Sequence, residues 1–599
     1  MLSVIASRGP DGQRKIEEAG FTFGFARLAI NDLSETGDQP MFSLDGQVVT
    51  MLNGEIYNAP ELRRELETKG YQFRGNSDAE VIPHGYAEWG IALFPRLRGM
   101  FAIAVFEKRT RTLTLVRDHF GIKPLYYAAI RDGVTFASSA RAVSLHPQVG
   151  QSLDHSVLSE FLRFRYVQSG RSPYKNVLTI PPGHMLISND AGVVLRRFWK
   201  RPRFAESSTT TLDVLIEKFQ QTLRASVKRE LLSDVPLGVL LSGGIDSGSV
   251  LFTANLEGAS DLLAYTYDMG GKASEASQAR EIAARYGARH KIVVANDADF
   301  HETFVAAVQC MDLPVGDAII APTYQLMKAV SADRKVVLTG EGADELMAGY
   351  AHVKPLRLLG SVVQAGVPSA VLAAVIRSVP WKVLDRFFPY EATLGVSGKK
   401  KVVSIVKSSG DPSEAIARAT SIFDVEEIRH GTHLPQHPEA GIVEDLSLAS
   451  LIDWGFDSWL PNQILNKMDQ LSMAHGVEAR VPFVDVDLYE CVAALPSNLL
   501  LSRTDNKRVL REALRESGYI HPNTPKRAFF QPVSNSHLRG LKELASEWAT
   551  EQIITKHGIF QPHFVRDIWS RVLAGDFLAS KQMTTLAALH IWLEQDFSR

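Results

Sequence analysis

The sequence predicts two domains of different fold class, an α+β domain over residues 1–205 and an α/β domain over residues 206–599. In the first, short alternating or apolar runs are separated by turn residues, which predicts stacked antiparallel β-sheets with flanking helices. In the second, apolar strand segments alternate with helical stretches such as 212–231 and 275–286. That alternation predicts a parallel sheet covered by helices, with further helices added over 351–450.

The composition is that of an ordinary globular protein. Apolar residues make up 45% of the chain, charged residues 22%, and the net charge is −2, so nothing favours a nucleic acid or a membrane surface as partner. The two cysteines, Cys310 and Cys491, exclude a disulfide framework and a cysteine-based zinc site. The first residues show no cationic segment followed by a long apolar core, so we expect no signal peptide and a cytoplasmic location.

One uncharged stretch, residues 358–376, is long enough to cross a membrane. It also contains Gln364, Gly366, Pro368 and Ser369. Because a proline in a helix interior breaks the helix, we expect two short buried helices separated near Pro368 rather than a membrane span.

A strand, a glycine turn and the start of a helix follow one another at residues 239–250. This geometry binds phosphate, because glycines let the backbone approach and free N–H groups at the helix start face the anion. The loop has no lysine but contains Asp246, and an aspartate beside a polyphosphate suits Mg²⁺. The alternative is a glycine turn that binds nothing.

The segment Ser-Gly-Gly-Ile-Asp-Ser at 242–247 resembles the pyrophosphate loop of the ATP pyrophosphatases. That resemblance implies a site for ATP and its pyrophosphate. The residues expected to form it are Leu241, Ser242, Gly243, Gly244, Asp246 and Ser247.

A second glycine-rich acidic segment, 339–345, follows the apolar strand 336–338. Since ligands bind at the carboxyl ends of parallel strands, we expect this segment to meet the first loop. Asp344 is then expected to share Mg²⁺ with Asp246, and Gly340 to approach the ATP. Glu341 is expected to approach the ATP as well, and to orient or deprotonate the attacking amine. The alternative is a glycine turn with solvated acids.

The first domain contains five motifs in a fixed order, at residues 8–12, 27–28, 53–58, 77–80 and 117–127. They resemble the glutaminase domain of the class II glutamine amidotransferases, which has an Ntn-type fold, in the variety fused to asparagine synthetases. The resemblance implies that a guanidinium grips the α-carboxylate of glutamine and that two acids receive its α-amino group. The residues matched to this role are Arg27, Asn53, Gly54, Glu55 and Asp78.

The nucleophile implied by this resemblance is an N-terminal cysteine whose own amine acts as the base. Here the chain begins Met1-Leu2-Ser3, and neither cysteine lies in the first domain. Ser3 is neither at the terminus nor in the matching register. Three explanations stay open: a shortened chain, a misassigned initiator methionine, or lost glutaminase activity with use of ammonia or another amine.

Three blocks of the second domain also resemble asparagine synthetases, namely 465–485, 507–513 and 526–532. The last implies that Lys526 lies near the ATP phosphates, where a lysine neutralises the charge that develops on leaving pyrophosphate. The alternative is a solvated lysine. Residues 312–314 read Asp-Leu-Pro where the family often has Asp-Glu-Pro, a departure that favours a specialised acceptor.

The resemblance covers nearly the whole chain and implies ATP-dependent amide formation through an acyl-adenylate. Aspartate or a specialised carboxylate would be joined to ammonia, which asparagine synthetases channel from glutamine, with ATP and Mg²⁺ as cofactors. The expected partners are therefore a small-molecule carboxylate or peptide and ammonia or glutamine, with no nucleic acid and no membrane; a homodimer is compatible.

Two alternatives stay open. Lasso-peptide cyclases and β-lactam synthetases share the scaffold and use an internal amine. An inactive scaffold homologue would bind a partner without catalysis.

Overall fold

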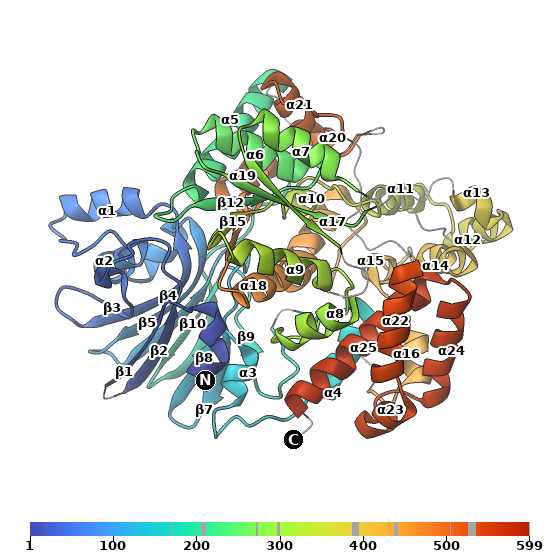
Figure 1. The fold of residues 1–599 in the computed structure, drawn as a ribbon, viewed down its shortest axis with the longest axis horizontal. Helices are drawn as coiled ribbons and strands as arrows, with labels where there is room; N and C mark the ends of the chain where they lie inside the picture. Colours follow the sequence, from blue (N-terminus) through green and yellow to red (C-terminus); the bar gives the residue numbers. More distant parts are fainter. Residues whose placement is uncertain are drawn as a thin grey trace.

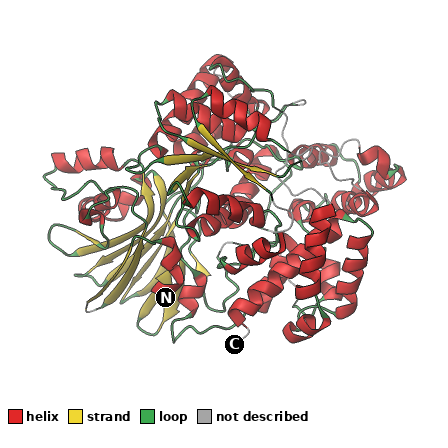
Figure 2. Ribbon diagram, viewed as in Figure 1, coloured by secondary structure: helices red, strands yellow, loops and turns green. Residues whose placement is uncertain are grey.

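The structure, a computed structural model, has antiparallel sheets in its N-terminal part, a parallel sheet beside them, and a layer of helices (Figures 1 and 2). It therefore has the mixed α/β and α+β architecture that the sequence predicts. The structure describes residues 1–18, 20–168, 170–204, 211–270, 274–295, 300–385, 395–435, 441–502, 505–524 and 535–597.

A six-stranded antiparallel sheet of order β11-β10-β6-β5-β4-β3 is the largest element of the N-terminal part. In its centre β5 alternates: Phe101 and Ile103 face helices α1 (Ala59–Thr68) and α2 (Val81–Trp89), whereas Ala102 and Ala104 face Phe23 of strand β2 (Phe21–Arg27). Both faces are thus covered, which explains the almost continuous apolar run of β5. The strands are β3 (Met41–Phe42), β4 (Val48–Ile56), β5 (Gly99–Glu107), β6 (Thr112–Arg117), β10 (His184–Asn189) and β11 (Gly192–Arg197).

Two smaller antiparallel sheets lie beside the large one, a hairpin of β1 with β2 and a three-stranded sheet of order β8-β7-β9 (Figure 1). Their strands are β1 (Gly12–Glu18), β2 (Phe21–Arg27), β7 (Tyr126–Ile130), β8 (Gly133–Ala137) and β9 (Leu178–Thr179); helices α1 and α2 span Ala59–Thr68 and Val81–Trp89.

The second sheet is parallel throughout, in the order β14-β13-β12-β15-β16. Helices α5, α6 and α7 pack on one face, and α9 and α18 on the other, as the alternation of strands and helices predicts. The strands are β12 (Leu237–Leu240), β13 (Leu263–Asp268), β14 (Arg289–Val294), β15 (Val336–Leu338) and β16 (Glu478–Arg480). The helices are α5 (Leu212–Glu230), α6 (Ile245–Leu256), α7 (Ala276–Arg285), α9 (Ile320–Ser331) and α18 (Asn466–Met473).

A layer of helices lies beside the parallel sheet, on the right of Figure 1. Its core forms around the fully buried Trp592 and includes side chains from α4, α8 and α25. Helix α14 stands in the same layer and packs on α15 and α12. The helices named here are α4 (His155–Phe164), α8 (Phe300–Gln309), α14 (Gly395–Lys407), α15 (Pro412–Thr420) and α25 (Phe577–Phe597).

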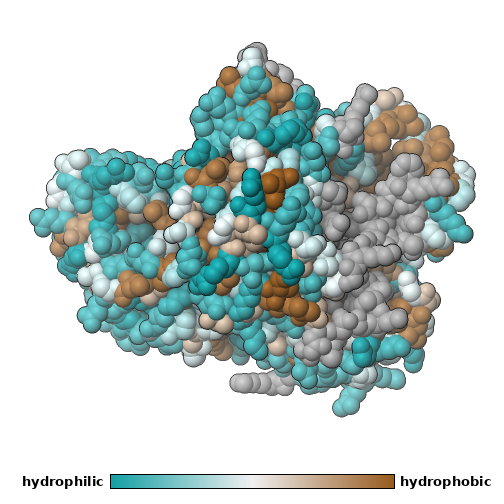
Figure 3. Space-filling view, turned by 45° about the horizontal axis from the view of Figure 1, so that its top comes forward, coloured by the Kyte–Doolittle hydropathy of each residue, from teal (hydrophilic) through white to brown (hydrophobic). Residues whose placement is uncertain are grey.

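The uncharged stretch 358–376 forms parts of two helices, α11 (Val353–Gln364) and α12 (Ser369–Ser378), which break at the expected place. The expectation that both are buried was wrong for α12, because Ala373 is its one buried residue. Val371 and Val375 are more than half exposed, and Figure 3 shows apolar surface at the upper right, over this segment. No helix among the described residues is long and apolar enough to span a membrane.

Ion pairs, some of them buried, join the N-terminal sheets to the parallel-sheet half. Asp469 on α18 accepts from Arg8 Nη1 at 2.8 Å and from Lys123 Nζ at 3.3 Å. Arg98, which precedes β5, donates to Asp487 at 2.8 Å. Since each pair links residues several hundred positions apart, they fix the orientation of one half on the other.

Candidate active site

A glycine-rich loop joins β12 to α6 at the carboxyl end of the parallel sheet. The hydroxyls of Ser242 and Ser247 lie 2.9 Å apart, and the backbone N–H groups of Ser242 and Gly244 donate to these two hydroxyls at 2.9 and 3.0 Å. Leu241 before the loop is buried, and its N–H donates to Tyr265 of β13. The loop is therefore held open at the start of a helix, where unpaired N–H groups favour an anion.

The segment that follows β15 packs directly against this loop. A Cβ atom at Gly340 would lie 2.6 Å from the backbone nitrogen of Ser247, so a larger residue cannot stand there. The two segments that the sequence places at adjacent strand ends therefore meet, because β12 and β15 are neighbours in the sheet.

Three charged side chains converge beside the loop. Lys507 Nζ lies 2.6 Å from both carboxylate oxygens of Asp246 and 2.6 Å from Oδ1 of Asp344. Lys507 is 2% exposed at its side chain, and burial alone would lower its pKa, but the two carboxylates raise it. The lysine ammonium is thus held charged between the two acids expected to share Mg²⁺.

Lys507 was not predicted as a site residue from the sequence, although the segment 507–513 was identified by its resemblance to asparagine synthetases. It adopts a left-handed backbone conformation, φ 52°, immediately before helix α21 (Arg508–Glu516). This backbone conformation cannot be predicted from the sequence, since lysine has no preference for the left-handed region. One signal was available in the sequence. Lys507 is the first residue of the segment 507–513, which resembles asparagine synthetases, and the glycine loop itself contains no lysine.

The pair of acids fits a divalent cation. Asp246 and Asp344 point at one position, which a cation, the Lys507 ammonium, holds in this structure. Mg²⁺ usually takes one or two protein carboxylates and completes its shell with phosphate oxygens and water. The described residues include no group of three or more acids, histidines or cysteines that could hold a metal ion by itself.

Glu341 lies next to Gly340, and its Oε2 atom is buried with no hydrogen-bond partner among the described residues. Burial raises the pKa of its carboxyl to about 7; Lys467 opposes this rise and Glu345 adds to it. Glu345 is itself paired with the hydroxyl of Tyr350 at 2.6 Å. A carboxyl that titrates near neutral pH is suited to proton transfer. Lys526, the other expected catalytic residue, lies outside the described residues.

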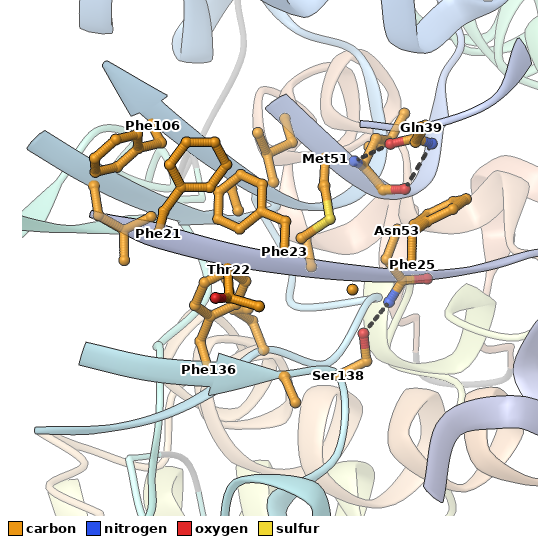
Figure 4. Close-up of a pocket in the computed structure, with 18 of the residues that line it drawn as sticks. Phe21, Thr22, Phe23, Phe25, Gln39, Met51, Asn53, Phe106, Phe136 and Ser138 are labelled. Carbon is orange, nitrogen blue, oxygen red and sulfur yellow. Dashed lines mark hydrogen bonds between the residues drawn. The ribbon is translucent and has the colours of Figure 1, made fainter. Parts of the chain in front are cut away.

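The five residues matched to glutamine binding all line one cavity of about 1230 Å³ in the N-terminal part. Asn53 donates to Ser138 Oγ at 3.2 Å, as Figure 4 shows. Gly54 has φ +128°, and a Cβ there would meet the carbonyl oxygen of Met100 at 2.0 Å. The backbone conformation at Gly54 is therefore open to glycine alone.

The charged members of this set have partners in the structure. Arg27 Nη1 donates to Asp38 Oδ1 at 2.6 Å, and its Nη2 donates to two backbone carbonyls. Burial raises the pKa of Glu55 well above its usual value, and the neighbouring Asp78 adds to the rise. Burial likewise raises the pKa of Asp78 to about 6, although Asp78 accepts from the backbone N–H of Ile56 at 2.7 Å.

The other wall of the cavity is apolar and aromatic. Figure 4 shows rings from strands β2, β5 and β8 along it, those of Phe21, Phe23, Phe106 and Phe136, which meet edge-on or tilted. No cysteine is among the described residues that line it. Cys310 and Cys491 lie in the other half, and Ser3 belongs to the short helix Leu2–Arg8 without lining the cavity.

The chain thus combines two candidate sites. One is a cavity in the antiparallel sheets with residues of the amidotransferase type, and the other is a glycine loop with acids at the end of a parallel sheet. This combination defines the class of ATP-dependent amidoligases. Comparison with known families narrows this class. Residues 218–594 match the family model described as asparagine synthase, and residues 1–199 match that of the glutamine amidotransferase domain. The chain belongs to the asparagine synthase family.

The similar curated proteins cover most of the chain. Asparagine synthetase [glutamine-hydrolyzing] 1 of Bacillus subtilis is 30% identical over 92% of this chain and 85% of its own length. A putative asparagine synthetase [glutamine-hydrolyzing] of Mycobacterium tuberculosis strain H37Rv is 32% identical over 91% of this chain and 85% of its own. Amidase chyE of Penicillium rubens is 28% identical over 89% of this chain and 84% of its own.

Proposed function

We propose that the protein forms an amide from a small-molecule carboxylate and ammonia through an acyl-adenylate, with aspartate or a specialised acid as acceptor. The observation that carries this proposal is the convergence of Asp246, Asp344 and Lys507 at the end of β12 and β15, with Glu341 beside them. Anion-binding backbone, cation-binding acids and a carboxyl near its titration point are the groups that adenylation and amide formation need.

The phosphate end of ATP is assigned to the glycine loop. Residues Ser242 to Ser247 present backbone N–H groups and hydroxyls at the helix start, and Lys507 supplies the positive charge that the loop lacks. Asp246 and Asp344 would hold Mg²⁺, which when bound neutralises the phosphates and polarises them for attack. Lys526 is proposed to stabilise the leaving pyrophosphate as well.

The two chemical steps balance with the groups assigned. A carboxylate oxygen of the acceptor attacks the α-phosphorus of ATP, the bond to the β-phosphate oxygen breaks, and pyrophosphate leaves. Ammonia then attacks the acyl carbon, a proton passes from its nitrogen to the Glu341 carboxylate, and AMP leaves. Glu341 serves this step because its pKa of about 7 lets it accept and return a proton at neutral pH.

The N-terminal cavity is proposed as a glutamine site. Arg27 would bind the α-carboxylate, Asn53 and Gly54 the side-chain amide, and Glu55 with Asp78 the ammonium group. We propose ammonia as the nitrogen source of the amide-forming step.

The test is pyrophosphate release from ATP with aspartate and ammonium, repeated with glutamine in place of ammonium. Release with ammonium alone supports the proposal, and steady glutamate production from glutamine would show that the nucleophile has been misplaced. Exchange of labelled pyrophosphate into ATP with a peptide, without added ammonia, would instead favour a cyclase that uses an internal amine. Absence of exchange with every carboxylate would favour an inactive scaffold. Asp246→Ala serves as the control that should abolish exchange.

A further inference from the structure

Four helices of the helical layer carry charge of almost one sign. They are α11, α12, α13 (Trp381–Asp385) and α14, on the right of Figure 1, and are called the basic lobe below. The basic lobe contains eight basic residues and one acid, Asp385, whereas the whole chain has 65 basic and 67 acidic residues. The net charge of the chain therefore hides a strong local excess of positive charge. The basic residues are Lys354, Arg357, Arg377, Lys382, Lys399, Lys400, Lys401 and Lys407.

The basic lobe also exposes aliphatic side chains. On α12, Val371 and Val375 lie one turn apart and are both more than half exposed, so they form a stripe on one face of the helix. Ala373, which faces the other way, is buried where α12 packs on α14. Leu358 of α11 and Val396 of α14 are exposed as well, and Figure 3 shows apolar surface over this part of the molecule. Apolar surface that polar groups surround marks an interaction site.

Basic side chains adjoin the apolar stripe of α12. Lys399 Nζ on α14 donates at 2.7 Å to the carbonyl of Arg377, which lies in the last turn of α12. Lys382 on α13 follows, with its Nζ 5.9 Å from the centre of the Trp381 ring. Within the described part of the chain, Arg377, Lys382 and Lys400 are exposed and pair with no acid. Their charges are therefore available to an anionic partner.

The chemistry of this surface favours a lipid bilayer over a protein as the partner. Six of the eight basic residues are lysines. Lysine is a flexible point charge and is depleted in interfaces between proteins, where arginine and aromatic residues are enriched. Aliphatic side chains beside lysines, with Trp381 among them, are instead typical of helices that lie in the headgroup region of an anionic membrane. Because the basic lobe contains one acid, repulsion from anionic headgroups is small.

We propose that the basic lobe binds the surface of a bilayer that contains anionic lipids. Val371 and Val375 enter the boundary between headgroups and acyl chains, and the lysines lie against the headgroups. The expectation of no membrane partner came from the net charge of the whole chain, which the basic lobe does not share. Helix α11 begins three residues after Tyr350, whose hydroxyl pairs with Glu345. A bound lobe would thus hold the segment that carries Glu341 near the bilayer, whichever reaction that segment performs.

The test is co-sedimentation of the purified protein with lipid vesicles. Vesicles of equal parts phosphatidylcholine and phosphatidylglycerol should bind it about tenfold or more tightly than vesicles of phosphatidylcholine alone, and added salt should reduce the difference. Lys382→Gln combined with Lys400→Gln should weaken binding to the mixed vesicles about 25-fold, because each basic residue near an anionic surface contributes about fivefold. Lys175→Gln combined with Lys218→Gln, at exposed positions outside the basic lobe, should change nothing.

The apolar contact is tested by a second pair of variants. Val371→Gln combined with Val375→Gln should weaken binding to the mixed vesicles about tenfold or more, because two aliphatic side chains no longer leave water. Glutamine suits an exposed helix position, so this variant is expected to fold. Val194→Gln, at an exposed position of strand β11, is the control and should bind as the wild type does.

Three results would overturn the inference. The first is a protein that binds neither kind of vesicle, or binds both kinds equally. The second is unchanged binding to the mixed vesicles in either the lysine pair or the valine pair of variants, both folded by circular dichroism. The third is retention on immobilised poly-glutamate by a protein that does not bind the mixed vesicles, which would assign the basic lobe to an acidic protein.

Discussion

The guanidinium of Arg480 lies 3.4 Å from the carboxylate of Glu55, and this ion pair joins the N-terminal cavity to the parallel sheet. Arg480 is fully buried on β16, where it also contacts Glu478 at 2.9 Å. The carbonyl of Arg480 accepts from the N–H of Thr339, two residues before Glu341. One edge strand therefore touches both candidate sites.

Arg480→Met should strongly destabilise the protein. It would leave the carboxylates of Glu55 and Glu478 buried without their cation, and breaking a buried ion pair from one side typically costs about 3–5 kcal/mol. The free energy of unfolding in urea is the measurement. Arg203→Met is the matched control, because its ion pair with Glu444 is exposed. A loss below about 1 kcal/mol, the range of exposed pairs, would contradict the assigned role of the pair.

Lys507→Met should increase the affinity of the nucleotide-free protein for a divalent cation. In the wild type the ammonium competes for the position between Asp246 and Asp344, so its removal leaves two carboxylates facing each other. Titration with Mn²⁺, followed by electron paramagnetic resonance, should show about tenfold tighter binding. Lys507→Arg keeps the charge and should resemble the wild type. Unchanged Mn²⁺ binding in Lys507→Met would show that the acids are not a cation site.

The same variant should lose pyrophosphate release. Lys507 lies at the glycine loop, where it pairs with Asp246. A cation at a leaving phosphate typically increases the rate by about 10²–10³. Tighter Mn²⁺ binding together with lost turnover would separate the metal role of the acids from the phosphate role of the lysine. Full activity in Lys507→Met would contradict the phosphate assignment.

The meeting of Asp246 and Asp344 was predictable from the sequence, because each follows a strand of a parallel sheet and neighbouring strand ends lie together. Lys507 was not, since it reaches the acids through a tertiary contact and a left-handed turn that no periodicity encodes. The strand and helix positions of the parallel-sheet half were likewise predictable from their alternation.

Exposure and charge partners were harder to predict. Helix α12 has an apolar sequence but lies at the surface, because burial depends on what packs against a helix rather than on its own pattern. The partner of Arg27 is Asp38, on a loop whose course the sequence does not define.

Asp38→Asn should tighten the binding of glutamine by about threefold, the scale of a partly exposed charge pair. Arg27 Nη1 donates to Asp38 at 2.6 Å, so this acid competes with the α-carboxylate that Arg27 is proposed to bind. Calorimetric titration of the purified protein with glutamine is the measurement. Asp45→Asn, which changes an acid on the loop between β3 and β4, is the control. Weaker binding in Asp38→Asn would mean that Asp38 positions Arg27 for glutamine instead of competing.

Glu341 should give the amide-forming step a pH dependence. Its pKa is raised to about 7 by burial, so the carboxylate that accepts the proton is formed as the pH rises through 7, and the step should accelerate over that range. With the concentration of free ammonia held constant at each pH, Glu341→Gln should flatten the profile and slow the step by about 10²–10⁴. The rate of this step is measured by single-turnover amide formation from pre-formed acyl-adenylate, over about pH 5.5 to 8.5. A profile that keeps its shape in Glu341→Gln would assign the proton to another group.

The same carboxyl predicts an effect on stability with a defined sign. Its pKa in the folded protein lies above the ordinary value of 4.5, so the protonated form favours folding; this contribution is complete below pH 4.5 and is lost as the pH rises through about 7. Glu341→Gln is neutral at every pH and should therefore gain stability relative to the wild type as the pH increases through 7. The free energies of unfolding of the two proteins in urea are compared at about pH 5 and about pH 8, on the two sides of that transition. A Gln variant with the same relative stability at both pH values would show that Glu341 is not buried as a neutral acid, which would remove the basis for its role as proton acceptor.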